Sequence, residues 1–143
     1  MGVTVAGVCT VAWLIALSVY DVRQRRLPNA LTLPGAAVVL FGATLAGRLL
    51  PALSGALALF VVYLLVHLLA SEAMGAGDVK LAIGVGALTG AFGIDVWALA
   101  ALGAPLLTAG WAIVSAVRHS GSPVPHGPSM CLTSAAAAAL AVL

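Results

Sequence analysis

PALSGALALFVVYLLVHLLASEAMGAGDVKLAIG, residues 51–84, joins two apolar runs through a short segment rich in glycine and charge. The first run, over 52–70, is long enough to cross a hydrocarbon layer, which takes about 17–25 residues of helix. Asp78 and Lys80 then stand among glycines just before the second run. The stretch predicts a membrane-spanning helix followed by a polar segment at the edge of the bilayer.

The composition of the whole chain supports a membrane protein. Of its 143 residues, 63% are hydrophobic and 7% are charged, whereas a soluble domain carries about 25% charged residues. The formal net charge of +2 is too small to indicate a nucleic-acid partner. Cys9 and Cys131 form no CxxC pair, so no zinc or redox motif is present, and we expect neither a metal nor a cofactor.

The apolar runs predict an all-α integral membrane protein with about six transmembrane helices, in a single polytopic domain over 1–143. The fourth and sixth runs are short, so five spans are the alternative. The N-terminal apolar run, over 3–20, is longer than the apolar part of a signal peptide and follows no basic segment, which favours a retained helix. The predicted helices are 3–20, 31–47, 52–70, 79–94, 96–117 and 128–143.

The positive charges predict the orientation. With the N-terminus outside, five of the six basic residues fall in inner segments, as the positive-inside rule requires. Those five are Arg23, Arg25, Arg26, Lys80 and Arg118, and only Arg48 lies outside. This topology places Asp21, at the end of the first helix, and Asp78, at the start of the fourth, together at the cytoplasmic edge.

Two carboxyl groups at one depth can perform acid–base chemistry. When they lie close together they share one proton, so that the ionised member activates a water molecule and the protonated member donates to a substrate carbonyl. The sequence assigns neither role to Asp21 or Asp78. We expect Gly75 and Gly77 to give the backbone unusual freedom beside Asp78 and to admit an extended peptide.

Simpler roles for the same charged residues stay open at this point. Asp78 could cap the fourth helix at its N-terminus, and Lys80 could be an interfacial anchor. Asp21 could form an ion pair with Arg23 or Arg25.

Other residues carry structural expectations. Gly84, Gly86 and Gly90 indicate close packing of helix backbones in lipid. Asn29 is expected to cap the second helix. His126 is expected to be solvated in the last inner loop, unless that loop folds inward toward the aspartates.

Three segments resemble signatures of the type IV prepilin peptidases. DVRQRRLPN, residues 21–29, is similar to their D-x-R-x-x-x-(I/L)-P-N signature after the first helix. GAGDVKL, residues 75–81, resembles their G-x-G-D-x-K-(L/F) signature. VPHGPSM, residues 124–130, is similar to the P-(Y/F)-(G/A)-P segment before the last helix. The three segments occur in the family's order, and the resemblance extends over nearly the whole chain.

The resemblance implies a membrane aspartyl endopeptidase, a hydrolase of the bacterial inner membrane. Such enzymes cut the short, positively charged leader from prepilins or pseudopilins on the cytoplasmic side, just before the substrate's hydrophobic segment. Carried over by position, the catalytic residues are Asp21 and Asp78, and Gly75 and Gly77 belong to the active-site motif. The implied partners are prepilin substrates and the lipid bilayer, and no oligomeric state is implied.

The chain departs from the larger members of that family. Those members carry an N-terminal cytoplasmic segment with two CxxC pairs and also methylate the new N-terminus. This chain resembles the short form often found with tight-adherence (Flp-type) pilus systems, so we expect no methyltransferase activity. Its short last helix raises the possibility of a truncated copy. A weaker resemblance links Tyr20, Asp21 and GAGD to presenilin-type proteases, but those proteins carry a Pro-Ala-Leu motif near the end of the chain, where this sequence has none.

Two other functions compete with a peptidase. Paired carboxylates also serve proton relays, so a small transporter or proton-conducting bundle is one alternative. Transport sites lie near the bilayer midplane, whereas Asp21 and Asp78 are predicted at one edge, which favours the peptidase. The second alternative is a non-catalytic assembly factor for a secretion system.

Overall fold

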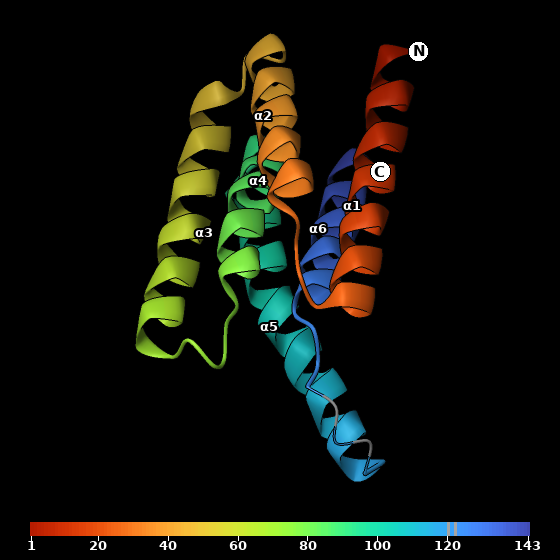
Figure 1. The fold of residues 1–143 in the computed structure, drawn as a ribbon. Helices are drawn as coiled ribbons and strands as arrows, with labels where there is room; N and C mark the ends of the chain where they lie inside the picture. Colours follow the sequence, from red (N-terminus) through yellow and green to blue (C-terminus); the bar gives the residue numbers. More distant parts are fainter. Residues whose placement is uncertain (120, 122) are drawn as a thin grey trace.

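A computed structural model describes residues 1–119, 121 and 123–143, which form six α-helices and no β-strand (Figure 1). The helices are α1 (Gly2–Gln24), α2 (Asn29–Leu45), α3 (Leu49–Leu69), α4 (Ala76–Phe92), α5 (Ile94–Val117) and α6 (Gly127–Val142). They confirm the all-helical prediction and lie close to the predicted segments. The main difference is that α1 continues to Gln24, so Asp21 lies inside its last turns instead of ending it.

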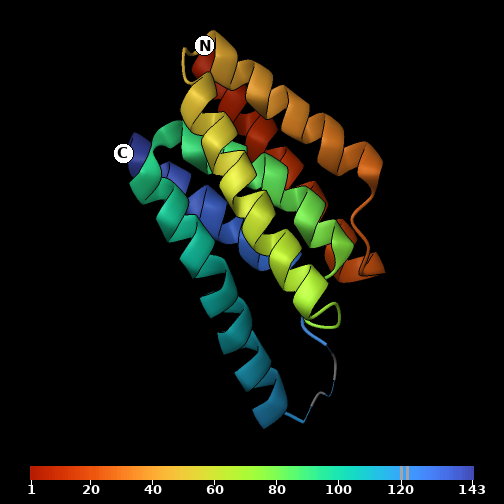
Figure 2. The same cartoon turned by 90° about the vertical axis from the view of Figure 1, so that its left-hand side faces the viewer.

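Successive helices run in alternating directions, so one end of the bundle gathers the last turns of α1, α3 and α5 and the first turns of α2, α4 and α6 (Figure 1). The last turns of α5 extend beyond the other helices at this end (Figure 2). The end therefore brings together segments that lie far apart in the sequence, including those that carry both aspartates.

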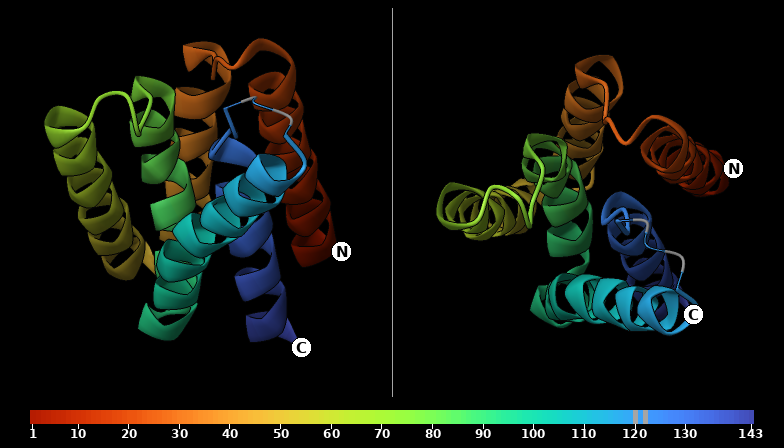
Figure 3. Two further views of the ribbon diagram at one scale, coloured as in Figure 1. Left: turned by 90° about the horizontal axis from the view of Figure 1, so that it is seen from below. Right: turned by 60° about the horizontal axis from the view of Figure 1, so that its bottom comes forward.

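Helix α4 occupies the middle of the bundle. It packs against α2, α3, α5 and α6, and Figure 3 shows it surrounded by these neighbours. Its buried residues lie on all sides of the helix, as expected for a helix with protein around it. They are Val79, Leu81, Ala82, Gly84, Val85, Gly86, Ala87, Thr89 and Gly90. The backbone that carries Asp78 is therefore anchored from several directions.

Glycines allow α4 to approach α3 at backbone distance. A Cβ atom on Gly86 would lie 2.5 Å from the carbonyl oxygen of Gly55, and one on Gly90 would lie 2.6 Å from that of Pro51. A Cβ on Gly84 would lie 2.8 Å from the ring of Trp13. The predicted role of these glycines in close helix packing is confirmed.

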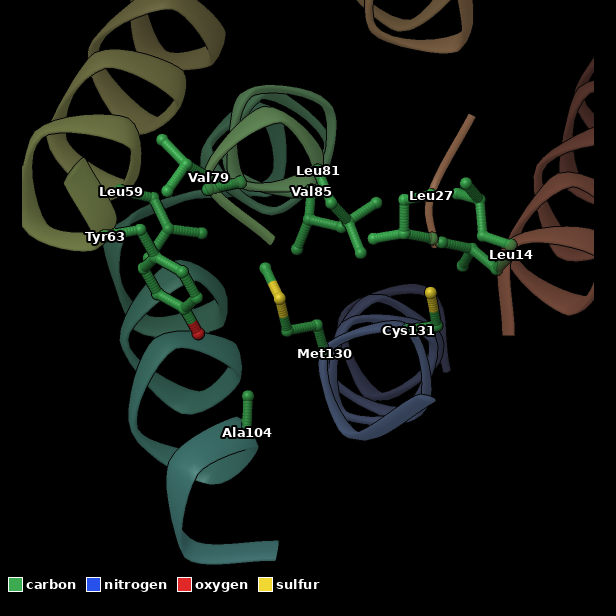
Figure 4. Close-up of a cluster of buried hydrophobic side chains, with 12 residues drawn as sticks. Leu14, Leu27, Leu59, Tyr63, Val79, Leu81, Val85, Ala104, Met130 and Cys131 are labelled. Atoms are coloured by element: carbon green, nitrogen blue, oxygen red, sulfur yellow. The ribbon is translucent and has the colours of Figure 1, made fainter. Parts of the chain in front are cut away.

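A cluster of apolar side chains fills the space between α1, α3, α4 and α6 (Figure 4). It includes Leu14, Leu17, Leu27, Leu59, Tyr63, Val79, Leu81, Val85, Met130 and Cys131. The outer surface is also apolar: many large hydrophobic side chains are exposed, such as Leu50 at 80% and Val38 at 70%. Contact between such a surface and water is unfavourable, whereas contact with the hydrocarbon chains of lipids is not.

Helices α1, α3 and α5 are each long and apolar enough to cross a membrane, and α2 and α6 are shorter apolar helices. Together with the apolar exterior, this identifies a membrane protein. The six-span count and the outside N-terminus stay predictions.

Candidate active site

Asp21 is enclosed between α1 and α6. Its side chain is only 8% exposed, and its Oδ2 atom accepts a hydrogen bond of 2.9 Å from the backbone N–H of Gly127, the first residue of α6. A Cβ atom at position 127 would lie 2.5 Å from that oxygen. Glycine at this position therefore lets the start of α6 approach the carboxyl group directly.

Asp78 lies in the first turn of α4, in a more open setting. Gly75 occupies the N-cap position, so the alternative in which Asp78 itself is the N-cap residue is wrong. Three residues further on, the Asp78 carboxyl group instead interacts with the backbone N–H of Gly75, as the third helical residue does in a capping box. Asp78 is half-buried and Gly75 is exposed.

The two glycines of the GAGD segment do not act as expected. Gly75 has φ −72° and ψ 152°, and neither Gly75 nor Gly77 has a positive φ, so the predicted unusual backbone freedom is wrong. Gly77 matters for packing, because a Cβ there would lie 3.1 Å from the Cβ of Leu27. At Gly75 a Cβ would meet only Asp78 Oδ2, at 3.9 Å, so the space beside Gly75 is open.

The structure brings Asp21 and Asp78 together from α1 and α4. They lie close enough for the charge of Asp21 to act on the carboxyl group of Asp78. The charge of Arg25 also acts on Asp21, but Arg23 and Arg25 are both exposed. The contact that holds the Asp21 carboxyl group is thus the Gly127 N–H, and not the ion pair with Arg23 or Arg25 that was the alternative.

A hydrogen bond joins the segments that carry the two aspartates. The Nζ atom of Lys80 donates to Oδ1 of Asn29 at 2.7 Å. Asn29 is the first residue of α2 and Pro28 is its N-cap, so the prediction that Asn29 caps this helix is wrong. Lys80 and Asn29 instead tie the first turn of α4 to the first turn of α2.

A polar cluster stands beside the aspartates and joins three parts of the chain. Nε2 of His126 lies 2.8 Å from the hydroxyl oxygen of Tyr63 in α3, and Nδ1 lies 2.6 Å from Oγ1 of Thr108 in α5. His126 is half-buried, so the expectation of a solvated ring is wrong. Sequence reasoning missed Tyr63 and Thr108, because nothing in their local sequence indicates a partner so far along the chain.

Burial lowers the pKa of His126 below its ordinary value, so the ring is neutral at pH 7. Elsewhere, Nδ1 of His67 lies 2.7 Å from the carbonyl oxygen of Met74, which ties the end of α3 to the segment before α4. Over residues 1–119, 121 and 123–143, no three His, Cys, Asp or Glu side chains gather as a metal site would require.

Comparisons with known proteins identify the family of the chain. The sequence profile of the type IV leader peptidase family matches residues 8–141. A curated relative, the prepilin leader peptidase/N-methyltransferase of Stutzerimonas stutzeri, is 35% identical over 132 residues, which cover 83% of this chain and 44% of the relative. The chain thus spans less than half the length of that relative. No solved structure matches it.

Proposed function

The chain belongs to the type IV leader peptidase family, and from this premise we propose that it is a membrane-embedded aspartic endopeptidase with Asp21 and Asp78 as its catalytic residues. Its substrates are type IV (Flp/Tad-like) prepilins or pseudopilins, from which it removes the leader on the cytoplasmic side. The observation that carries the proposal is the meeting of Asp21 and Asp78 at one end of the bundle, where the charge of Asp21 acts on the carboxyl group of Asp78.

The chemistry needs one proton shared by the pair. The ionised carboxyl group takes a proton from water, whose oxygen attacks the scissile carbonyl carbon, while the protonated carboxyl group donates to the carbonyl oxygen. The tetrahedral intermediate then collapses and the C–N bond breaks. The carboxyl group that took the proton from water gives it to the leaving amine, and the other carboxyl group takes back a proton from a hydroxyl of the intermediate. Because the two groups are coupled, both titration steps belong to the pair and not to one residue.

We propose that the substrate approaches the site from the side of Gly75. That residue is exposed, and the space above its Cα is open except for Asp78. An extended peptide could lie there with its backbone close to the carboxyl group, which a helical substrate could not do because its carbonyls are already hydrogen-bonded. Gly75 and Gly77 are thus proposed as active-site residues through access and packing.

The placement in the cell completes the proposal. The single domain over 1–143 crosses the bacterial plasma membrane in about six spans with its N-terminus outside. The five basic residues predicted inside then share the cytoplasmic end with Asp21 and Asp78. A leader that is positively charged stays on that side for the same reason, which places the scissile bond at the depth of the aspartates.

Co-expression with candidate prepilins from the same genome tests the proposal. A gel scores loss of the leader for wild type, Asp21→Asn and Asp78→Asn, and a membrane immunoblot shows that all three are present. We expect cleavage by wild type alone, because each amide removes one half of the acid–base pair. Equal processing by all three would reject the mechanism and favour an assembly role.

A further inference from the structure

The backbone donor that holds Asp21 directly follows His126. The Gly127 N–H lies 2.9 Å from Asp21 Oδ2, and His126 is the N-cap residue of α6. This hydrogen bond holds the carboxyl group of Asp21 in place. The position of the His126 backbone therefore decides where the carboxyl group of Asp21 lies.

The ring of His126 is held at both nitrogens by different helices. Tyr63 of α3 lies at 2.8 Å from Nε2, and Thr108 of α5 lies at 2.6 Å from Nδ1. A neutral ring has one N–H and one bare nitrogen, so one hydroxyl accepts a hydrogen bond and the other donates one. Two contacts on opposite sides of the ring leave it little freedom to turn.

Tyr63 extends the cluster to the second aspartate. Its side chain is 5% exposed, and its hydroxyl group points from α3 toward Ala104 of α5 (Figure 4). The charge of Asp78 acts on this hydroxyl group. The cluster thus touches Asp21 through Gly127 on one side and borders Asp78 on the other.

We propose that Tyr63, His126 and Thr108 form a positioning cluster. The cluster holds the Gly127 N–H within hydrogen-bond distance of Asp21 and so sets the position of Asp21 relative to Asp78. None of the three contacts the reacting atoms in this role. The contribution to cleavage rests on the proposed function, whereas the contribution to the Gly127–Asp21 contact does not.

Hydrogen exchange tests the structural half without any substrate. The purified protein in detergent micelles is compared with Tyr63→Phe, Thr108→Val and His126→Phe. The first two nearly keep the side-chain volume, the third keeps an aromatic ring, and each removes hydrogen bonds of the cluster. We expect faster amide exchange in the peptide covering residues 124–130 for all three. Thr10→Val is the matched control, because the Thr10 hydroxyl bonds only the Ala6 carbonyl of its own helix, at 2.8 Å. It should exchange like wild type.

Cleavage kinetics test the catalytic half. Misplacement of Asp21 should lower kcat by roughly 10- to 100-fold while KM changes little, since loss of alignment acts on the chemical step. His126→Gln, which can still reach Tyr63, should recover part of the rate. The double variant Tyr63→Phe/His126→Phe should lower kcat no more than the worse of the two single variants, because both substitutions break the same hydrogen bond.

The outcomes separate the two proposals. Unchanged exchange at 124–130 in all three variants would overturn the cluster, and so would faster exchange with wild-type kcat. Faster exchange with reduced kcat supports it. If wild type cleaves no prepilin, the proposed function fails, while the exchange measurement still decides whether the cluster holds Gly127 against Asp21.

Discussion

The two aspartates of the site have opposite surroundings. Asp21 is enclosed: it is 8% exposed, and the first backbone N–H of α6 rests on its carboxyl group. Asp78 is half-buried at the open N-terminus of α4, beside an exposed glycine that leaves free space next to it. The protein holds one carboxyl group by a backbone hydrogen bond, and the other lies on the side from which we propose that the substrate arrives.

This difference separates positioning from access. A fixed carboxyl group can serve as the reference point of the site, since catalysis depends on placement to within about 1 Å. An open carboxyl group lets a peptide backbone come close. Changes on the enclosed side should therefore affect the chemical step, and changes on the open side should affect binding.

The largest effect is expected from Gly127→Ala. The new Cβ would lie 2.5 Å from Asp21 Oδ2, so the carboxyl group must turn away from its place. Because this oxygen is at the end of a side chain, the fold should survive. We expect kcat to fall about 100-fold with normal protein levels in the membrane. Wild-type kcat in this variant would show that Asp21 needs no such contact.

Gly75→Ala should produce the opposite pattern. Its backbone angles suit alanine, and its Cβ would lie 3.9 Å from Asp78 Oδ2 with no other neighbour within 4 Å. The added methyl group occupies the space assigned to the substrate. We expect KM to rise, by up to about 10-fold, with kcat and thermal stability nearly unchanged. A lower kcat with an unaltered KM would contradict the assignment of substrate binding to the open side, at Asp78, and of positioning to the enclosed side, at Asp21.

The stability of the enclosed side should decrease in mild acid. Burial lowers the pKa of His126 in the folded state, whereas the unfolded chain has the ordinary value of about 6.5. Above that value both states are neutral and stability is unaffected. Below it the unfolded state binds a proton that the folded state resists, so stability falls as the pH drops. Between pH 7.5 and pH 5, wild type should therefore lose thermal stability relative to His126→Phe, and thermal unfolding of both proteins measures this difference.

The smallest effect concerns the link between Lys80 and Asn29 on the open side. This hydrogen bond of 2.7 Å is exposed, so we expect a coupling energy of only about 0.5 kcal/mol. A double-mutant cycle with Lys80→Met and Asn29→Ala, followed by thermal unfolding, measures it. A coupling several times larger would mean that the open side is held as firmly as the enclosed side.

The sequence predicted the helices well because each one is a long apolar run with a polar or glycine-rich break. It also predicted the meeting of the aspartates, since the number of helices between Asp21 and Asp78 returns the chain to the same end of the bundle. Both inferences depend on patterns that are local or countable.

The finer geometry could not be predicted in this way. The Gly127 contact with Asp21 joins residues 106 positions apart, and the bond between Tyr63 and His126 joins residues 63 positions apart. Such contacts follow from how α6 packs against α1 and α3, which no local pattern specifies. The same limit explains the error at Gly75 and Gly77, where glycine serves access and packing and not an unusual backbone angle.

The most direct test asks whether one chain holds both aspartates in one site. Purified Asp21→Asn and Asp78→Asn variants are reconstituted together in vesicles and given a prepilin substrate, with wild type diluted by either variant as the reference. We predict no cleavage by the mixture, because each copy lacks one member of its own pair. Restored cleavage would contradict this, since it would require Asp21 of one copy to act with Asp78 of another.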